Sequence, residues 1–335
     1  MSMWGGLFID KYGSKKVLLA SLLLFGKVFL CLFLLFSSLY PIIFNVLLWC
    51  CMFFFDTASK AYISESCIEE ERPIIFSHRL IAINCGAAIG LFYIAFLNKL
   101  QPEMLFLATS FICYIVFFLY LVYTFNYQAI QNKTASLPAS MFNLIAKDKS
   151  LINFCIIGII LFTAYSQLTS TLPLVLNMPN SNAHQFYAKL LLINTIIIIF
   201  IQIPVGIIIN KFNIHIFSYI GIALLTLSYL TLASANATNW YLIALFMLSF
   251  SEVINSTVNN IIIDKLAPLG MKGIYFGFNG FAMIGLSIGP VLGGFILEKS
   301  GKTILYLGVS ILVTICFFLY WKCINKISNF TGASC

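Results

Sequence analysis

The sequence predicts an all-helical protein that crosses a membrane many times. Of its 335 residues, 61% are apolar and only 9% are charged, whereas a soluble domain is about a quarter charged. The mean hydropathy is +0.99. The apolar residues form runs long enough for helices of about 20 residues, the length that crosses a hydrocarbon core. This composition excludes a soluble domain, a disordered chain and a small disulfide-stapled domain.

Ten complete membrane spans are predicted, and a partial span over residues 1–9 precedes them. The runs are continuous between short polar turns, so they differ from barrel strands, which alternate polar and apolar residues. The ten spans cover residues 17–38, 42–64, 76–98, 103–125, 150–173, 187–209, 216–234, 240–263, 275–297 and 303–321.

The Lys and Arg residues indicate how these spans face, because cytoplasmic loops carry an excess of positive charge. When the polar turns are assigned alternately to the two sides, 14 of the 19 Lys and Arg residues fall on one side and four on the other, and Lys27 lies within a span. The richer side is predicted to be cytoplasmic and to hold the carboxyl terminus. A cell (inner) membrane location is expected.

The longest polar stretch, residues 126–149, is predicted to be a cytoplasmic linker between two helical bundles. The N-terminal bundle then covers residues 1–125 and the C-terminal bundle covers residues 150–321. Residues 322–335 form a predicted cytoplasmic tail.

The two predicted bundles contain an internal repeat. Residues 6–11 read GLFIDK and residues 206–211 read GIIINK, at an offset of 200. An offset of 199 pairs three further positions, Glu65 with Asp264, Gly86 with Gly285, and Gly90 with Gly289. Repeats at this scale are typical of duplicated helical bundles in transporters.

The repeat predicts that the first bundle lacks a helix. In the second bundle, the span over residues 150–173 precedes the pair of helices that carries the GIIINK motif. The first bundle should have a counterpart, which would fall before residue 1. A late start codon, a fragment and a decayed gene each remain open as the reason.

The segment over residues 6–16, GLFIDKYGSKK, resembles the loop between helices 2 and 3 of the major facilitator superfamily. Other segments, YSQLTSTLPLVL, LAPLGMKGIYFG and GLSIGPVLGG, resemble helix 7, the loop between helices 10 and 11, and helix 11 of its drug/proton antiporter-like members. Ser14 stands where a basic residue is common, and Lys272 stands where Arg is usual. The matching motif residues are Gly6, Asp10, Lys11, Gly13, Lys15 and Lys16.

The resemblance implies two pseudo-symmetric six-helix bundles, the first of them incomplete here, and a gating role for this motif. In the family, the acid braces helix 11 and holds the outward-facing state, so Asp10 would meet the start of that helix near residues 275–277. The alternative is a solvated turn whose lysines merely stop the translocating chain. Gly13 suits a tight turn in both cases.

Several charged side chains lie inside predicted spans, where a charge at mid-bilayer costs at least about 2.5–3.5 kcal/mol. Such groups should face a bundle interior or a watery cavity. Glu252 is the first candidate for proton coupling and Asp56 is the second. The alternative for Asp56 is a static pair with Lys60, four residues later on the same helix face.

Other polar side chains in the spans are candidates for the lining of a substrate cavity, with helix–helix hydrogen bonds as the alternative. These candidates are Lys27, Asn84, Gln167, Asn194 and Asn255. Glycines four residues apart predict close helix packing, either static or sliding, and Pro290 predicts a bend. The glycines are Gly86, Gly90, Gly285, Gly289 and Gly293.

These features together favour a secondary active transporter that works by alternating access, with proton-coupled efflux of drug-like or amphipathic compounds. The alternatives are proton-coupled uptake of a small polar or peptide-like solute, and a truncated remnant that does not transport.

No CxxC pair, HExxH motif or catalytic constellation is present, so neither an enzyme nor a cofactor or metal is predicted. The expected partners are a small-molecule substrate, protons and the lipid bilayer. Nucleic acid is not expected, since no basic patch with aromatics exists, and a monomer is expected.

Overall fold

The computed structural model describes residues 2–35, 41–96, 102–124, 147–176 and 183–331, and helices are the regular secondary structure in these ranges. Packing divides the chain into two compact units, which are described separately. Residues 1–69, 89–145 and 264–280 form the first unit, and residues 70–88, 146–263 and 281–335 form the second. The predicted linker falls almost wholly outside the described ranges, and the predicted bundle boundaries remain predictions.

The described part of the chain contains nine helices that are long and apolar enough to cross a membrane. The last of these covers residues 272–322 and contains a break at Gly301, where φ is 78°. This stretch therefore holds two of the predicted spans. Each of the ten predicted spans coincides, in its described part, with one of these helices, which confirms the all-helical membrane fold.

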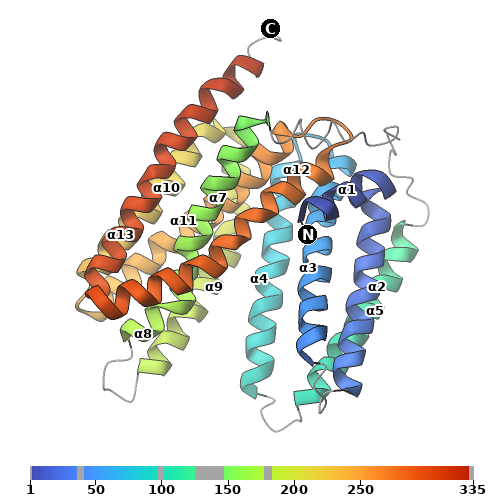
Figure 1. The fold of residues 1–335 in the computed structure, drawn as a ribbon, viewed down its shortest axis with the longest axis horizontal. Coiled ribbons are helices and arrows are strands. Elements are labelled where there is room, and N and C mark those ends of the chain that lie inside the picture. The colour runs from blue at the N-terminus through green and yellow to red at the C-terminus, as the bar shows by residue number, and fades with distance from the viewer. Residues whose placement is uncertain (1, 36–40, 97–101, 125–146, 177–182, 332–335) are drawn as a thin grey trace. The chain divides into compact units, whose positions relative to one another are not determined.

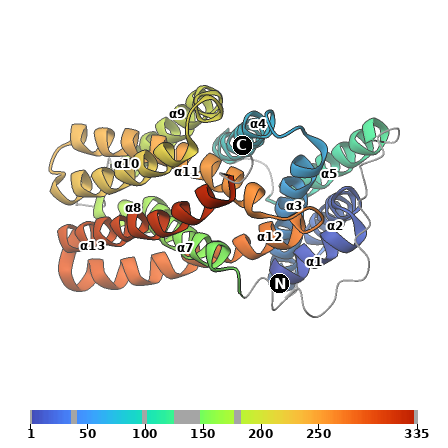
Figure 2. The same ribbon diagram turned by 90° about the horizontal axis from the view of Figure 1, so that it is seen from above.

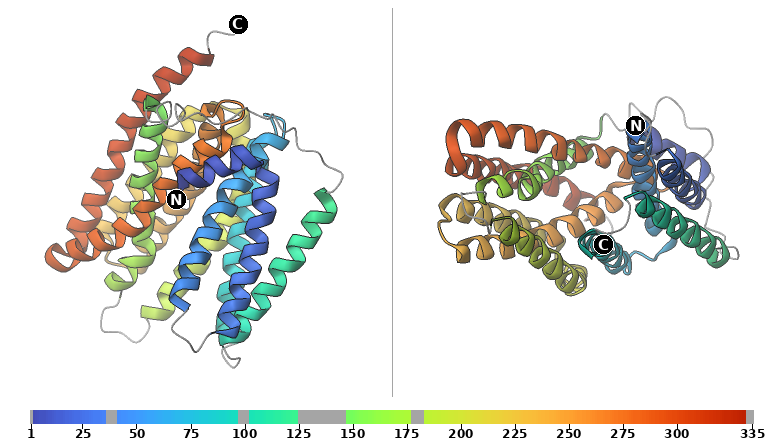
Figure 3. Two further views of the ribbon diagram at one scale, coloured as in Figure 1. Left: turned by 45° about the vertical axis from the view of Figure 1, so that its right-hand side comes forward. Right: turned by 90° about the horizontal axis from the view of Figure 1, so that it is seen from below.

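In the first unit, α2 is the central helix. Helix α2 packs against both α3 and α5, while α1 packs against α12 (Figures 1 and 3). The helices are α1 (Ser2–Tyr12), α2 (Ser14–Leu34), α3 (Pro41–Ser66), α5 (Pro102–Thr124) and α12 (Lys272–Asn279).

Two glycines position these helices. At Gly13 the backbone has a φ of 91°, a value that favours glycine, and the turn there joins α1 to α2. Gly26 of α2 lies against α5, because a Cβ there would come within 2.9 Å of the Tyr114 ring. The Ser110 hydroxyl of α5 donates to the Gly26 carbonyl oxygen at 2.8 Å. Glycine thus allows the two helices to approach closely, as is common in lipid.

In the second unit, α13 packs against both α7 and α10 (Figure 2). Helix α4 (Arg72–Phe96) contributes its residues up to Ala88 to this unit. The other elements are α7 (Lys149–Ser170), α8 (Leu172–Leu176), α9 (Ala183–Lys211), α10 (Ile214–Ser234), α11 (Thr238–Leu266), the short 3₁₀ helix η1 (Gly280–Ile284) and α13 (Gly285–Thr331).

Side chains at the predicted turns determine where two of these helices begin. Asp148 accepts hydrogen bonds from the backbone N–H groups of Ser150 and Leu151 at 3.0 and 3.3 Å, at the start of α7. Asn213 accepts one from the His215 N–H at 2.9 Å, at the start of α10. Each of these bonds satisfies a donor that the first turn of a helix leaves free.

The contact between α7 and α13 depends on three buried glycines of α13, Gly285, Gly289 and Gly293. A Cβ at Gly285 would lie 2.8 Å from the Thr163 nitrogen, and one at Gly289 would lie 2.8 Å from the Thr163 carbonyl oxygen. A Cβ at Gly293 would lie 2.8 Å from the Thr171 methyl group. Any side chain at these positions would push the two helices apart.

The residue predicted to bend this helix, Pro290, lies in backbone that is helical in the structure. The departures from α geometry lie elsewhere, in η1 before it and at Gly301 after it. A 3₁₀ segment is wound more tightly than an α-helix, and within a helix it often marks a hinge or a strained sequence. The described backbone therefore changes geometry at η1 and Gly301, while a bend at Pro290 remains a prediction.

We predict that Gly285→Leu destabilises the protein by about 1–3 kcal/mol, because the new side chain overlaps α7. Gly294→Leu is the matched control, since no described atom lies within 4 Å of a Cβ at Gly294. The measurement is the Tm of each purified variant in the same detergent. Equal Tm values for the two variants would contradict the close α7–α13 contact.

Candidate functional site

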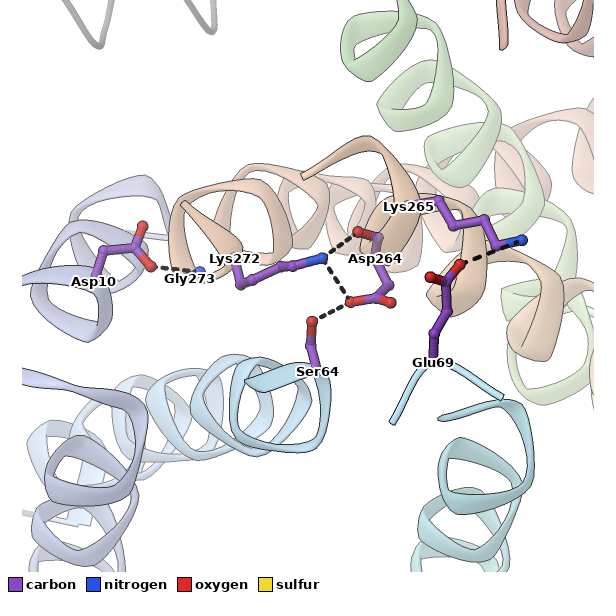
Figure 4. Close-up of polar contacts among 7 residues, drawn as sticks. All are labelled: Asp10, Ser64, Glu69, Asp264, Lys265, Lys272 and Gly273. Atoms are coloured by element: carbon purple, nitrogen blue, oxygen red, sulfur yellow. Dashed lines mark hydrogen bonds and ion pairs between the residues drawn. The ribbon is translucent and has the colours of Figure 1, made fainter. Parts of the chain in front are cut away.

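The Asp10 carboxylate caps a helix that lies more than 260 residues away in the sequence. Its Oδ1 accepts the Gly273 N–H at 2.7 Å (Figure 4). Its Oδ2 accepts the Ile274 N–H at 2.9 Å. Both donors belong to the first turn of α12, whose own N-cap residue, Met271, makes no side-chain cap. A carboxylate here also meets the positive end of the helix dipole.

Close approach of α1 and α12 makes this cap possible. A Cβ at Gly6 would lie 2.6 Å from the Ile274 Cα, and a Cβ at Gly273 would lie 2.6 Å from the Gly6 carbonyl oxygen. The sequence placed the contact near residues 275–277, and the structure places it at Gly273 and Ile274, immediately before them. The register differs because the helix begins at Lys272, three residues before the predicted span.

Burial raises the pKa of Asp10 to about 7, which is well above the ordinary value of 3.8. The hydrogen bonds from Ile274 and Gly273 lower the pKa, since they favour the charged form. The nearby Glu65 carboxylate raises it further by repulsion. Burial has the largest effect, so the carboxyl group in this contact titrates close to neutral pH.

A buried ion pair lies beside this cap. The Lys272 Nζ donates to the Asp264 Oδ1 at 3.0 Å and to the Asp264 carbonyl oxygen at 2.5 Å, and both side chains are at most 8% exposed. The Ser64 hydroxyl donates to the same carboxylate oxygen (Figure 4). Removal of one partner of such a buried pair leaves an uncompensated charge, which is strongly destabilising.

Two further contacts connect α3 to this region. The Ser14 hydroxyl donates to the Glu65 carboxylate at 2.5 Å, and Lys265 lies 3.9 Å from Glu69 in an exposed pair. The exposed pair contributes little to stability. We call the buried and half-buried groups the Asp10 network, which consists of Asp10, Ser14, Ser64, Glu65, Asp264, Lys272 and Gly273.

Part of the Asp10 network was not predicted from the sequence. The repeat paired Glu65 with Asp264, but nothing indicated that Asp264 binds Lys272, or that Ser64 joins them. The available signal was the spacing of Asp264 and Lys272, which flank a turn with Pro268 and Gly270. A turn of this kind brings the two ends of the segment together.

The lysines of the motif are more accessible to solvent than the buried members of this network. Lys11 is exposed and lies over the Tyr12 ring at 5.2 Å from its centroid. Lys16 is exposed and Lys15 is half-buried. Their position is compatible with both the gating and the stop-transfer interpretation.

The second copy of the motif makes a related contact inside the second unit. The Asn210 amide donates to the Glu70 carbonyl oxygen at 2.8 Å, just before α4 begins. A Cβ at Gly206 would lie 2.9 Å from the Ser77 Cβ. Glycine again allows close approach, but an amide replaces the carboxylate and bonds to a loop carbonyl instead of a helix start.

Three of the charged residues singled out in the sequence lie within spans of the first unit. Lys60 and Asp56 form an ion pair at 2.7 Å, with 18% and 28% of their side chains exposed. This is the static pair that the sequence offered as the alternative to proton coupling by Asp56. Lys27 is exposed on α2, and its predicted contact with substrate remains a prediction.

A polar cluster lies among α7, α10 and α11 in the second unit. The Asn255 Nδ2 donates to the Tyr165 hydroxyl at 2.9 Å and to the Ser251 hydroxyl at 3.0 Å, and the Ser251 hydroxyl donates to the Gly221 carbonyl oxygen at 2.8 Å. The Asn255 Oδ1 is buried and has no hydrogen-bond partner among the described residues. Glu252, three residues before Asn255, is half-buried, and its carboxylate has no hydrogen bond or ion pair in the described ranges.

The other cavity candidates make hydrogen bonds within or between helices. Gln167 donates to the Gly289 carbonyl oxygen of α13 at 2.9 Å and accepts from Thr171 at 3.0 Å. Asn194 donates to the Ser249 hydroxyl of α11 at 3.0 Å, and Asn84 donates to its own helix at Leu80, at 2.9 Å. Each of these amides therefore has a partner without any ligand.

Comparison with known proteins identifies the class. The human organic anion transporter MFSD10 (TETRAN) has the same fold, with a TM-score of 0.81 at 15% identity over 95% of this chain and 80% of that one. A second solved structure, the transporter FucP in the outward conformation, gives a TM-score of 0.76 at 15% identity over 96% of this chain and 86% of that one. The fold is thus that of polytopic membrane transporters.

The sequence gives the family. The family model described as Major Facilitator Superfamily matches residues 1–283, and the chain belongs to this superfamily of transporters. It is 27% identical over 311 residues to YqjV of Bacillus subtilis (strain 168), an uncharacterised transporter of the superfamily, covering 90% of this chain and 74% of the relative. It is 22% identical over 327 residues to YdeE of Escherichia coli (strain K12), covering 96% of this chain and 82% of that one.

We predict that Asp10→Ala accelerates hydrogen exchange at the Gly273 and Ile274 amides. The change removes both acceptors, and loss of a helix cap weakens the first turn by about 0.5–2 kcal/mol. The measurement is hydrogen exchange with mass spectrometry on peptides that cover residues 271–280. Asn210→Ala is the control, because Asn210 belongs to the second copy of the motif, and it should leave this peptide unchanged.

We also predict that the contact weakens as pH rises. A carboxyl group whose pKa is raised in the contact binds its proton more tightly there than in water. The contact is therefore most stable below the ordinary value of 3.8 and loses this stabilisation as pH rises through about 7. Exchange at residues 273–274, corrected for intrinsic rates, should increase from pH 6 to pH 8, and Asp10→Asn should abolish this dependence.

Proposed function

We propose that the chain is a secondary active transporter that moves a small molecule across the cell inner membrane by alternating access. Its proposed activity is efflux of drug-like or amphipathic compounds in exchange for protons. We further propose a cytoplasmic carboxyl terminus and a monomeric state. The leading support for alternating access is the cap that Asp10 forms on α12.

This cap suits a gate because all of its groups can be satisfied in two ways. When α1 and α12 are together, the two N–H donors of α12 bond to Asp10. When the helices separate, water can satisfy both the donors and the carboxylate at the membrane surface. The contact then contributes to the preference for one state without trapping the protein in it, since helix caps contribute only about 0.5–2 kcal/mol.

Glu252 is the proposed proton carrier. A carrier must accept and release a proton, and a carboxylate that is already paired with a cation is poorly suited, because the pair favours the ionised form. Asp56 is held in that way by Lys60 at 2.7 Å, which makes it the second candidate. Glu252 has no such partner in the described part of the second unit, and it lies in a helix that spans the membrane.

The direction of transport is proposed from the motifs of α7 and of the last spans, which resemble those of drug/proton antiporters. In the second unit, Asn255 is the proposed substrate contact, because its Oδ1 is buried and has no hydrogen-bond partner among the described residues. Uptake of a small polar or peptide-like solute is the second candidate, favoured by a solved structure of this fold that is titled a fucose:proton symporter. A remnant that does not transport is the third candidate.

We predict that Glu252→Gln abolishes proton-driven flux while leaving the protein folded in the membrane, because the amide cannot release a proton. The measurement is flux of a panel of fluorescent amphipathic compounds in proteoliposomes, with and without a pH gradient. Glu298→Gln is the matched control, since Glu298 is exposed on α13, and it should retain flux.

The same assay separates the three candidates. Export that requires the pH gradient supports efflux, and gradient-driven accumulation of polar solutes supports uptake. Absence of flux for every compound in the folded wild-type protein supports the remnant. Unchanged gradient-driven flux in Glu252→Gln would remove Glu252 as the carrier and leave Asp56 to be tested.

A further inference from the structure

The second unit contains a small enclosed cavity with buried hydroxyl groups in its wall. Its volume is about 10 Å³, which is at the lower end of what one water molecule needs. The residues around it come from α7, α8, α10, α11 and α13, and all of them are buried. Three are polar, Gln167, Tyr229 and Tyr306, and the others are leucines.

One polar group in this wall lacks a partner. The Tyr306 side chain is fully buried, and its hydroxyl makes no hydrogen bond of ordinary geometry with a described residue. Thr171 lies nearby, but its hydroxyl already donates to Gln167. A buried hydroxyl without a partner costs about 1–3 kcal/mol, and phenylalanine would fill the same space without this cost. Water in the cavity supplies the missing partner, because buried waters bond to polar groups that the protein leaves unsatisfied.

Two other groups in the wall suit the same water. The Tyr229 hydroxyl donates to the Ala164 carbonyl oxygen at 2.5 Å, and its oxygen can still accept a hydrogen bond. The Gln167 Oε1 accepts from Thr171 at 3.0 Å, and an amide oxygen has a second lone pair. The rings of Tyr229 and Tyr306 have centroids 5.9 Å apart. A water that accepts from Tyr306 and donates to these two oxygens makes three bonds, the usual number for a buried water.

On one side, further tyrosines connect the cavity to Glu252. The Tyr229 hydroxyl is close enough to Tyr306 for an electrostatic interaction, and it interacts in the same way with Tyr165 and Glu252. The Tyr165 hydroxyl also interacts with Glu252. The other titratable side chain beside Tyr165 is the Cys316 thiol of α13, which is only a weak hydrogen-bond donor.

On the other side, the cavity approaches the end of the bundle. Tyr306 follows the break at Gly301, and it interacts electrostatically with Tyr241. Tyr241 is half-buried near the start of α11, and it donates to the Ala235 carbonyl oxygen at 3.4 Å. The turn after Ala235 is exposed, and the charge distribution predicts that it faces the outside of the cell. The tyrosine row, as we call these residues, consists of Tyr241, Tyr306, Tyr229 and Tyr165.

We propose that the cavity binds one water molecule, and that this water and the tyrosine row carry protons to Glu252. This inference rests on the proposed role of Glu252 as the proton carrier. In one passage, each hydroxyl and the water gives a proton to the next oxygen and takes one from the oxygen before it. One O–H bond breaks and one forms at every oxygen, so no tyrosine is left charged. The net change is one proton moved from bulk water to the Glu252 carboxylate.

Time-resolved infrared spectroscopy in lipid nanodiscs tests the route. Light releases protons from a caged acid, and the carboxylic-acid band that Glu252→Gln removes reports protonation of Glu252. Tyr306→Phe and Tyr229→Phe keep the ring and remove the hydroxyl. Each should slow the rise of this band by about 100-fold, the lower end of what a positioned group contributes to proton transfer. The final amplitude should be unchanged, whereas a role in packing alone would leave the rate unchanged.

Tyr219→Phe is the matched control, because Tyr219 lies on α10 and stacks on Phe317, outside the tyrosine row. It should keep the wild-type rate, and an equal slowing in this control would overturn the route. A rise as fast in both row variants as in the wild type would overturn the route and leave Glu252 as the carrier. If the wild type has no band that Glu252→Gln removes, the proposed proton carrier and this inference both fail.

A high-resolution density map of the purified protein tests the water separately. One peak is expected in the cavity, within hydrogen-bond distance of the Tyr306 hydroxyl, and it should be absent in Tyr306→Phe. An empty cavity with Tyr306 bonded directly to Thr171 would overturn the water site.

Discussion

Close approach of helices at glycine is the constraint on which the rest of this structure depends. In lipid, apolar side chains gain little by leaving the solvent, so helices associate where their backbones can come near one another. Gly6 and Gly273 do this for α1 and α12, and Gly289 does it for α7 and α13. The polar contacts follow from that proximity, because Asp10 reaches the Gly273 and Ile274 amides only where no Cβ stands between the helices.

Satisfaction of buried polar groups determines which side chains remain available for function. The amides of Gln167, Asn194 and Asn84 bond to neighbouring helices or to their own, and Asp56 is paired with Lys60. An unsatisfied group in a low-dielectric interior is costly, so such pairing is the ordinary outcome. Among the described residues of the polar cluster, Glu252 and the Asn255 Oδ1 lack such a partner. This is the physical reason for which we propose a functional role for them.

The two copies of the motif share their glycine and differ in their polar group. Asp10 offers two acceptors to the start of α12, whereas Asn210 donates to the Glu70 carbonyl oxygen. Only the first contact can change its charge with pH. Both halves of the repeat therefore have the glycine that lets helices approach closely, but only the first half has a titratable side chain beside it.

The sequence by itself determined the class of protein, the ten spans, the repeat and the positions of the motif glycines. Apolar runs and glycine spacing report local requirements, since a span must fill the bilayer and a tight turn must tolerate positive φ. Only the tertiary structure decided that Lys272 binds Asp264, that Asp10 caps α12 at Gly273, and that Gln167 bonds to α13. These contacts depend on the register of helices far apart in the chain, and a one-residue shift along a helix turns a side chain by about 100°.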